Sequence, residues 1–594
     1  MSDYTLIKRL NSGSYAEALL VRMKKSRQIS VVKVPLSSSP LGDDVIKESI
    51  LLKSMKHPNI IKLKNLLTHE SRIVMELERM DNHLKLQKLN LVQFRATLKD
   101  IVSGVRRVHL EGFGHHDLKP ANILVRSGKV KVADFGLCQF KSIPRSSLGY
   151  CTGTPIYTAP QCIDETSYIF RNKDIVKGQQ SILADVWGIG VFIYDFVHHK
   201  VYGKSVFDTE EIMYLLDYNV SAEVEQYRNA KDKGLPSGWR TIEDTEGNIR
   251  YKYELRDITE FADDSPLKKQ TIIEHVGETG FDLMRQCLTL ETHLRPTTTD
   301  ILKHPFFKES DIIPFNFQQQ PQQFQQLQQQ GGTPQDIDID DLYHGVWGKL
   351  LPGPLKSYQF GYLSEWRELW GNRIIDSNKN IQSIINNKLL IIIDWLLTSK
   401  IRLSPDSVIF AGRLIRMYIS KSKEPHKIPI QGYSMAALRI GTILYKQSPL
   451  ERCELIYASS RACNINELTE FESNLLLALN EVESINLSHI GFLLMDNYIR
   501  VQTPANKKEM KIILYKSLLI ACYCSFLGLE KGSARDYCYS LMKIANTGVS
   551  QKEINDQMDA KLVGNSKINL DHIAYIFDNK KFKEHMEKID KMLS

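Results

Sequence analysis

The pattern of hydrophobic and polar residues changes once along the chain, near residue 308. Before that point, short strand-like runs such as SVVKV at 30–34 and KVKVADF at 129–135 alternate with helical stretches. From about Leu342 to the end, the helical period dominates and strand alternation is almost absent. We therefore predict an α+β first half and an all-α second half. Helix-length segments with one apolar face cover 384–399, 407–420, 433–446 and 467–479.

A low-complexity segment separates the two halves. Residues 317–330 read FQQQPQQFQQLQQQ and are followed by GGTPQDIDIDD. Such a polar stretch cannot bury a core, so it is interpreted as a linker. The sequence thus predicts a first domain over 1–308, a flexible Gln-rich linker over 309–341, a helical domain over 342–484 and a more divergent helical repeat over 485–594.

Composition narrows the class of protein only modestly. The chain has 77 basic and 69 acidic residues and a net charge of +8, a weak bias for 594 residues. It has no dense basic stripe with interleaved aromatic residues, so we expect no nucleic-acid partner. The longest apolar run, 389–397, is too short to cross a bilayer, and the N-terminus has no apolar segment, so we expect no membrane partner. Nine scattered cysteines indicate reduced thiols in an intracellular protein, cytoplasmic or nuclear.

A polar loop in the first half carries the strongest chemical signal. HHDLKPAN at 115–122 is followed by Asp134-Phe135-Gly136, directly after a strand-like run. Phosphoryl transfer needs a carboxylate at the acceptor hydroxyl, a cation near the moving group and oxygen ligands for Mg²⁺. Asp117 can provide the carboxylate and Lys119 the cation, while Asn122 and Asp134 can provide the metal ligands. A coincidental polar turn is a far poorer explanation of this spacing.

Two segments upstream complete a nucleotide site. Lys33 lies in the strand-like run 30–34, and Glu48 opens the helical stretch ESILLKSMKHPNI, so the two can form an ion pair. Upstream, LNSGSYAEA at 10–18 stands where a glycine-rich phosphate lid is expected, with only Gly13 of the usual glycines present. Taken alone, this lid would be read as an ordinary hairpin.

Together these motifs resemble the protein kinase family over about residues 4–307. GTPIYTAPQ at 153–161, DVWG at 185–188 and LRP at 294–296 fit the same pattern. The resemblance implies a bilobal kinase fold, ATP and Mg²⁺ as cofactors, and protein substrates, and Lys119 with Thr154 is the serine/threonine-type pattern. The residues it implies at the nucleotide are Leu10, Asn11, Gly13, Ala18, Val31, Lys33, Glu48, Met75, Glu76 and Leu124.

Two positions depart from the family pattern. His116 stands where most kinases carry an arginine that pairs with a phosphorylated activation-segment residue, and an imidazole is a poor bidentate phosphate partner. Gln161 replaces a glutamate that normally pairs with an arginine such as Arg295. Neither change removes a catalytic group, so an active kinase is preferred over a pseudokinase scaffold.

The helical half suggests how such a kinase is regulated. The stretch from Gly42 through Ile60 is similar to the PSTAIRE helix region of cyclin-dependent kinases, and 389–421 looks like the opening of a cyclin box. This resemblance implies an intramolecular contact that activates the kinase in cis, with Lys446 and Glu472 gripping the kinase helix. An unrelated helical interaction domain is the alternative.

One insertion in the first domain has a pattern of its own. LPSGWRTIEDTEGNIRYKY at 235–253 looks like the first half of a WW domain without the second tryptophan. A surface hairpin is the preferred interpretation.

Overall fold

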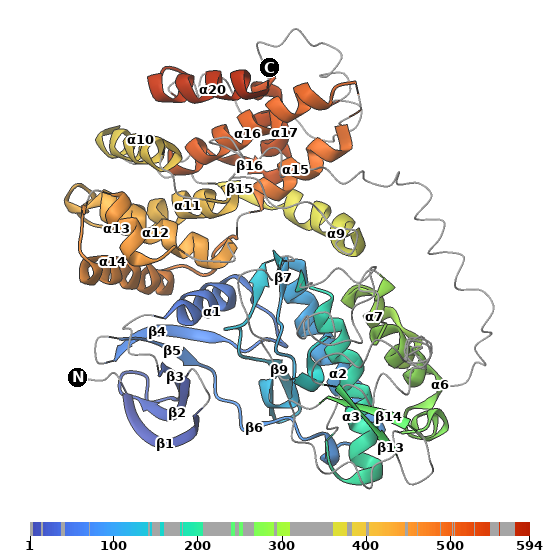
Figure 1. The fold of residues 1–594 in the computed structure, drawn as a ribbon. Helices are drawn as coiled ribbons and strands as arrows, with labels where there is room; N and C mark the ends of the chain where they lie inside the picture. Colours follow the sequence, from blue (N-terminus) through green and yellow to red (C-terminus); the bar gives the residue numbers. More distant parts are fainter. Residues whose placement is uncertain are drawn as a thin grey trace.

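The computed structural model describes two lobes in the first half of the chain and a stack of helices in the second (Figure 1). The described residues are 4–140 apart from 13–15, 37–41 and 70–71, then 143–144, 155–159, 179–180, 182–205, 239–243, 249–253, 267–289, 294–308, 360–376, 383–398, 403–445, 450–459, 461–487, 489–501, 503, 505–527, 529–546, 558 and 576–593. The predicted linker 309–341 therefore lies outside the described residues.

The N-terminal lobe is a five-stranded antiparallel sheet with one helix packed on it. The strand order is β1-β2-β3-β5-β4, and alternate side chains of these strands face a small core that includes Val21, Val32 and Val74. Helix α1 packs against β4 and β5 on the other face. The elements are β1 (Tyr4–Ser12), β2 (Ala16–Met23), β3 (Ile29–Pro35), α1 (Asp43–Ser54), β4 (Leu63–His69) and β5 (Arg72–Leu77).

The second lobe is mainly helical and is built around α3 (Ala184–Tyr202). From Ala184 to His198 every residue of α3 is buried, as expected for an apolar helix at the centre of a lobe. Helix α2 (Leu91–Leu110) begins at a capping box on Asn90, and its Phe94 stacks on Phe196 of α3 at 4.1 Å between ring centroids. The other helices are α6 (Lys269–Cys287) and α7 (Thr298–Lys303).

Short strands join the lobes and carry the polar loops. β6 (Asn82–His83), β8 (Ile123–Arg126) and β9 (Lys129–Val132) form one sheet, and β7 (Phe113–Gly114) pairs with β10 (Gln139–Phe140). β11 (Ile143–Pro144) pairs with β12 (Gln179–Gln180). The strands predicted at 30–34 and 129–135 correspond to β3 and β9, so the α+β prediction for the first half is confirmed.

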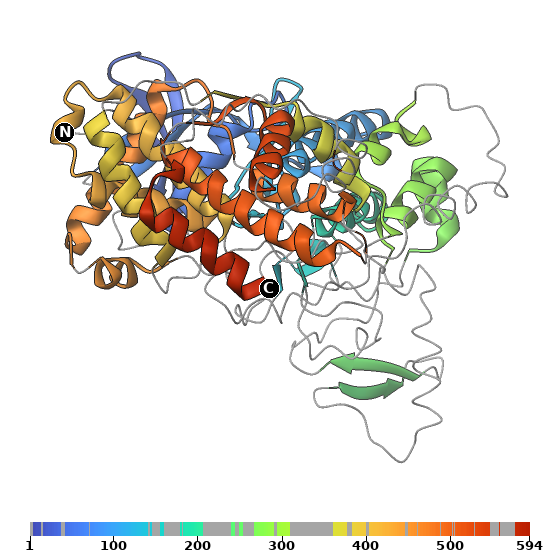
Figure 2. The same cartoon turned by 90° about the horizontal axis from the view of Figure 1, so that it is seen from above.

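The insertion at 235–253 contains a two-stranded antiparallel hairpin. β13 (Trp239–Glu243) pairs with β14 (Ile249–Tyr253), and Figure 2 shows the two strands well away from the helices. The described part of this insertion is therefore a hairpin.

The second half consists of helices packed around α11, α12 and α16. Helix α11 contacts both α12 and α16, and α12 also contacts α14. Gly441 allows α11 and α12 to approach closely, because a Cβ atom at this position would lie 2.4 Å from the carbonyl oxygen of Ser407. The segments predicted as helices at 384–399, 407–420, 433–446 and 467–479 correspond to α10 (Ser383–Thr398), α11 (Pro405–Lys421), α12 (Ile430–Tyr445) and α14 (Ile465–Leu477).

The remaining elements lie on either side of this group. The two strands that the structure describes in this half, β15 and β16, pair with each other. The elements are α9 (Phe360–Gly371), β15 (Ile374–Asp376), α13 (Arg452–Ala458), α15 (Ile490–Val501), α16 (Lys507–Leu527), β16 (Lys531–Ser533), α17 (Ala534–Ala545) and α20 (Lys580–Leu593).

The helical half lies directly on the first half. Helices α12 and α14 contact α1, and α9 contacts α2, so both lobes are touched (Figure 1). The buried apolar residues of the second lobe, α1 and the helical half form one continuous cluster. The position of α1 is therefore coupled to the packing of the C-terminal helices.

Helix α16 is the one described helix with the length and composition of a membrane span. Residues Lys508–Leu527 have a mean hydropathy of 1.6, and 89% of this stretch is buried inside the protein. A buried core helix meets the same criteria of length and composition, so this is weak evidence for a membrane span.

Candidate active site

Three charged side chains meet between the lobes. The Lys33 ammonium lies 2.7 Å from Glu48 Oε2 and 2.8 Å from Asp134 Oδ1. Burial alone would lower the pKa of Lys33, but the charges of Glu48 and Asp134 raise it above its ordinary value. Burial raises the pKa of Glu48 even though Lys33 opposes the shift. The ion pair predicted from sequence is thus formed, and it links β3, α1 and the loop after β9.

The backbone at Asp134 directs its carboxylate toward this pair. Asp134 has a φ of 67°, in the left-handed region, and its side chain is half exposed. Burial alone would raise the pKa of Asp134, but the neighbouring Lys33 lowers it. The next residue, Phe135, is fully buried beside His115, and its N–H lies 3.4 Å from Glu48 Oε1. The buried phenyl ring therefore anchors a loop whose carboxylate remains accessible.

Asp117 lies in a tightly bonded loop between β7 and β8. Its Oδ2 accepts a hydrogen bond from Asn122 Nδ2 at 2.8 Å and lies 2.9 Å from Lys119 Nζ. Asn122 Nδ2 also lies 2.9 Å from the carbonyl oxygen of Asp117. Among the described residues, Asp117 Oδ1 has no hydrogen-bond partner. The carboxylate is thus held by one oxygen, while the other is buried and makes no hydrogen bond to a described residue.

A buried aspartate that sequence reasoning did not assign holds this loop. Asp185, the first acidic residue of α3, accepts hydrogen bonds from the N–H groups of His115 and His116 at 2.6 and 2.8 Å, and His109 Nε2 lies 2.8 Å from its Oδ2. Burial would raise the pKa of Asp185, but His109 and the nearby histidines hold it far below its ordinary value. The signal in the sequence is an acidic residue at the start of a long apolar helix.

His116 is enclosed by the loop. It has a φ of 63°, and the side chain is buried, with no described hydrogen-bond partner at Nε2. A Cβ atom at Gly114 would lie 2.4 Å from that nitrogen, so a larger residue there would have to displace the His116 ring. Burial lowers the pKa of His116 to about 4, and the nearby cationic groups act in the same direction. The imidazole is therefore neutral at physiological pH.

Several predicted nucleotide-binding residues share one row of the N-terminal sheet. Asn11 is paired with Ala18, Ala18 with Lys33, and Lys33 with Met75. Directly paired residues lie on the same face of a sheet, so this row leads to Lys33. Val31 is the next residue on this face of β3, and Leu10 lies in β1 at the register shift just before Asn11. Leu124 is half-buried in β8, and Gly13 lies outside the described residues.

The side chain of Glu76, another predicted nucleotide-binding residue, faces away from Lys33. Its carboxylate accepts hydrogen bonds from Ser30 at 2.6 Å and Asn65 at 2.7 Å. It is paired with Val32, which faces the small core and not Lys33. Side chains alternate along a strand, so a residue adjacent to Met75 points to the other face. Only the main chain of Glu76 remains available to a nucleotide.

The oxygen donors fit Mg²⁺ bound together with a nucleotide. Asp134 presents a half-exposed carboxylate, and Asn122 presents an amide oxygen. Asn122 directly precedes β8 and Asp134 follows β9 by two residues, so both flank the open end of the β8–β9 hairpin. Among the described residues, no group of three or more His, Cys, Asp or Glu side chains is arranged for a metal. Mg²⁺ commonly uses one or two protein oxygens and completes its shell with phosphate and water, which this donor set allows.

Arg295 is stabilised within the second lobe. Its Nε donates to the carbonyl oxygen of Thr289 at 2.7 Å and its Nη1 to that of Leu183 at 3.1 Å. Its guanidinium also lies over the Trp187 ring, 5.3 Å from the ring centroid. Gln161 and Thr154 lie outside the described residues. The main-chain carbonyls and the indole thus help to compensate the charge of Arg295.

Comparison with known proteins agrees with this geometry. The protein kinase domain model matches residues 4–307. Maternal embryonic leucine zipper kinase of Danio rerio is 30% identical over 208 residues, which cover 33% of this chain and 29% of that protein. The chain thus spans less than a third of the length of this relative. From the match over more than half of its length, together with the catalytic loop and the ion pair, the chain belongs to the protein kinase family.

Proposed function

We propose that this chain is an ATP-dependent serine/threonine protein kinase, activated in cis by a cyclin-like C-terminal domain. The observation that carries the proposal is the coexistence of the Lys33–Glu48 pair with contacts from the C-terminal helices to α1, the helix that bears Glu48. A kinase needs this pair in place to orient the phosphates.

The catalytic groups have distinct roles in this proposal. Mg²⁺, when bound, neutralises charge on the nucleotide phosphates. Lys33 orients the phosphates, and Asp134 and Asn122 hold the metal. Asp117 accepts the hydrogen bond of the substrate hydroxyl and takes its proton, while Lys119, 2.9 Å from Asp117 Oδ2, offsets charge on the transferred group. Every group is present, which favours an enzyme over a pseudokinase scaffold.

The C-terminal domain holds α1 from both ends. At its start, Asp43 Oδ1 lies 2.5 Å from Arg439 of α12. Just beyond its end, Lys56 lies 2.7 Å from Glu483. On the neighbouring strand β4, Asn480 donates to the Leu66 carbonyl and accepts from the Leu66 N–H, both at 2.8 Å. Glu48 lies between these anchors, so they restrict the swing of α1 that would break its ion pair with Lys33.

Of the two residues predicted to hold the kinase helix, the structure describes only Glu472. Glu472 is fully buried and lies 2.6 Å from Arg452 and 3.5 Å from Arg439, so it supports Arg439 and does not itself reach α1. Lys446 lies outside the described residues. The contact that we propose to activate the kinase therefore runs through Arg439.

Phosphate transfer from ATP and Mg²⁺ tests the enzyme. Full-length protein and Asp117→Asn are compared on peptides that differ only in a serine, threonine or tyrosine acceptor. We expect transfer to serine or threonine, lost by on the order of a thousandfold in the variant, since the catalytic base is removed while nucleotide binding is retained. Folded wild-type protein that binds ATP but transfers nothing would support the scaffold instead.

A further inference from the structure

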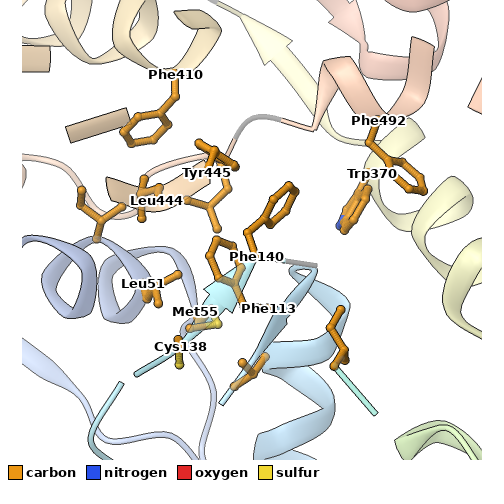
Figure 3. Packing of buried hydrophobic residues seen from close by; sticks show 14 of the residues in the cluster. Leu51, Met55, Phe113, Cys138, Phe140, Trp370, Phe410, Leu444, Tyr445 and Phe492 are labelled. Carbon is orange, nitrogen blue, oxygen red and sulfur yellow. The ribbon is translucent and has the colours of Figure 1, made fainter. Parts of the chain in front are cut away.

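The C-terminal domain makes a second, buried contact, with the larger lobe. Trp370 of α9 is fully buried, and its Nε1 donates to the Leu110 carbonyl at the end of α2 at 2.7 Å. Its indole stacks on His489, just before α15, with ring centroids 3.8 Å apart and planes at 15°. This contact lies on the opposite side of Phe140 from α1 (Figure 3).

An ionic cluster adjoins the stack. Glu111, the residue after α2, is almost fully buried, and its carboxylate lies 2.6 Å from both Arg107 and Arg373 and 3.5 Å from His489 Nε2. Arg373 and His489 belong to the C-terminal half, whereas Arg107 belongs to α2. The buried carboxylate is thus compensated from both sides of the contact, as a stable interface requires.

The stack continues to a residue close to the catalytic centre. The ring centroid of Phe140 in β10 lies 5.7 Å from that of His489, with the rings nearly parallel. It lies 4.9 Å from that of Tyr445 of α12 in an edge-to-face arrangement, and Figure 3 shows Phe140 beside Tyr445. Such ring pairs contribute beyond their buried area. Phe140 follows the metal ligand Asp134 by six residues and lies at the start of the activation segment.

β10 connects this contact to two catalytic carboxylates. Phe140 is paired with Phe113, and Gln139 with Gly114, directly before His115, His116 and Asp117. The ring of Phe140 also contacts that of Phe113 at 5.0 Å. Fixing β10 against β7 therefore constrains the strand that leads into Asp117 and the one that leads away from Asp134.

At the His116 position, the structure has no charged side chain to bind a phosphate on the activation segment. His116 occupies the position of the usual phosphate-binding arginine, but its ring is buried against Gly114. We propose that Phe140, held by His489 and Tyr445 of the C-terminal domain, is a positioning residue that sets Asp117 and Asp134 for transfer without a phosphate on the activation segment. This inference rests on the proposed kinase function.

Variants of the full-length protein separate the ring stack from simple folding. Phe140→Leu keeps an apolar side chain but loses the ring, and His489→Ala loses the stack and the contact with Glu111. His489→Phe restores only the ring. Phe582→Leu is the matched control, because Phe582 is also fully buried and packs on Tyr523 and Phe577, between α20 and α16.

Initial rates are measured after phosphatase treatment, with the phosphorylation state checked by intact mass. We expect the kcat of the wild type to be the same before and after phosphatase treatment. Phe140→Leu and His489→Ala should lower kcat on the order of tenfold with KM for ATP nearly unchanged, since misplaced groups slow the chemical step. His489→Phe should recover most of the kcat, and Phe582→Leu should match the wild type per folded molecule. Loss of wild-type activity on dephosphorylation, or equal kcat for Phe140→Leu and Phe582→Leu, overturns the inference.

Hydrogen exchange keeps this test independent of the proposed function. Amides at 138–140 should exchange faster in His489→Ala than in the wild type or Phe582→Leu, whether or not the protein transfers phosphate. If the wild type transfers no phosphate, the proposed function fails. The hydrogen-exchange result alone then decides whether the C-terminal domain holds β10. Unchanged exchange would overturn the positioning role while leaving kinase activity intact.

Discussion

Arg439 and Asp43 join the two halves of the chain through a nearly buried guanidinium. Arg439 Nη2 lies 2.5 Å from Asp43 Oδ1, and its Nη1 lies 3.5 Å from Glu472 Oε1. The side chain of Arg439 is 3% exposed. Asp43 is the first residue of α1, where an acidic group also interacts favourably with the helix dipole. The arginine is thus fixed inside its own domain while it holds the start of the helix that carries Glu48.

Replacing Arg439 by methionine should uncouple α1 from the C-terminal domain. We expect Arg439→Met to lower kcat/KM for ATP by roughly ten- to a hundredfold, because Glu48 would no longer be held against Lys33. Steady-state kinetics at several ATP concentrations, normalised to folded protein, provide the measurement.

Arg413→Met is a matched control for this change. Arg413 also pairs with a buried glutamate, Glu530, at 2.8 Å, and both residues belong to the C-terminal domain. Both variants leave a buried carboxylate with less compensation and should lose stability. If the two lose activity equally, the contact between Arg439 and Asp43 is not specific, and cis activation through α1 is wrong.

The proposed catalytic residues could be predicted from sequence because their chemistry fixes their spacing. Asp117, Asn122 and Asp134 lie within a short stretch, and the Lys33–Glu48 pair follows from one strand and the next helix. Glu76 was assigned to the same site by position, but strand alternation places its side chain on the other face. A motif identifies a strand more reliably than it assigns the face of each residue.

The contacts between the halves could not be found in this way. Trp370 and Leu110 are 260 residues apart, and no local period connects them. Arg439 did carry a signal, since it is a charged residue within the apolar and small-residue run AALRIGT of a helix that is almost entirely buried. A charge at such a position needs a partner, but the sequence does not say that the partner is Asp43, almost four hundred residues away.

The ion pair itself can be tested by removing one charge. Glu48→Gln should lower kcat/KM for ATP by roughly one to two orders of magnitude, because an amide cannot hold the Lys33 ammonium against the phosphates equally well. Glu530→Gln is the matched control, as it removes a buried carboxylate that pairs with Arg413, away from the nucleotide. Kinetics of both variants at saturating peptide, with thermal unfolding to verify folding, decide the point. Equal rates would show that the pair is structural only.

The carboxylate of Glu111 should make the protein sensitive to acid. Burial would raise the pKa of Glu111, but the hydrogen bond with His489 and the charges of Arg373 and Arg107 lower it to about 2. Because its pKa is depressed on folding, Glu111 stabilises the protein above the ordinary carboxylate range and loses that contribution as the pH falls toward 2. Linkage sets the contribution at about 3 kcal/mol near neutral pH, of which roughly 1 kcal/mol is lost by pH 4.

Urea denaturation of the wild type and Glu111→Gln from pH 7 to pH 4 measures this effect. The variant should be less stable at pH 7, and the difference in free energy of unfolding should narrow as the pH is lowered. A difference that stays constant over this range would show that Glu111 titrates normally in the folded protein.

Restoring the usual arginine at His116 should harm this kinase. His116 is a buried, neutral ring whose pKa is lowered to about 4, and Lys47 is among the cations that lower it. A permanent charge at this position should destabilise the protein by about 1–3 kcal/mol. The reason is that the nearby buried carboxylate, Asp185, already accepts hydrogen bonds from the loop and is not free to pair with the new arginine.

His116→Gln keeps a neutral polar side chain and is the control. Thermal unfolding should show a lower midpoint for His116→Arg than for His116→Gln, with no gain in phosphate transfer. An arginine variant that is as stable as the wild type and becomes more active on phosphorylation would mean that the loop accommodates a phosphate-binding charge after all.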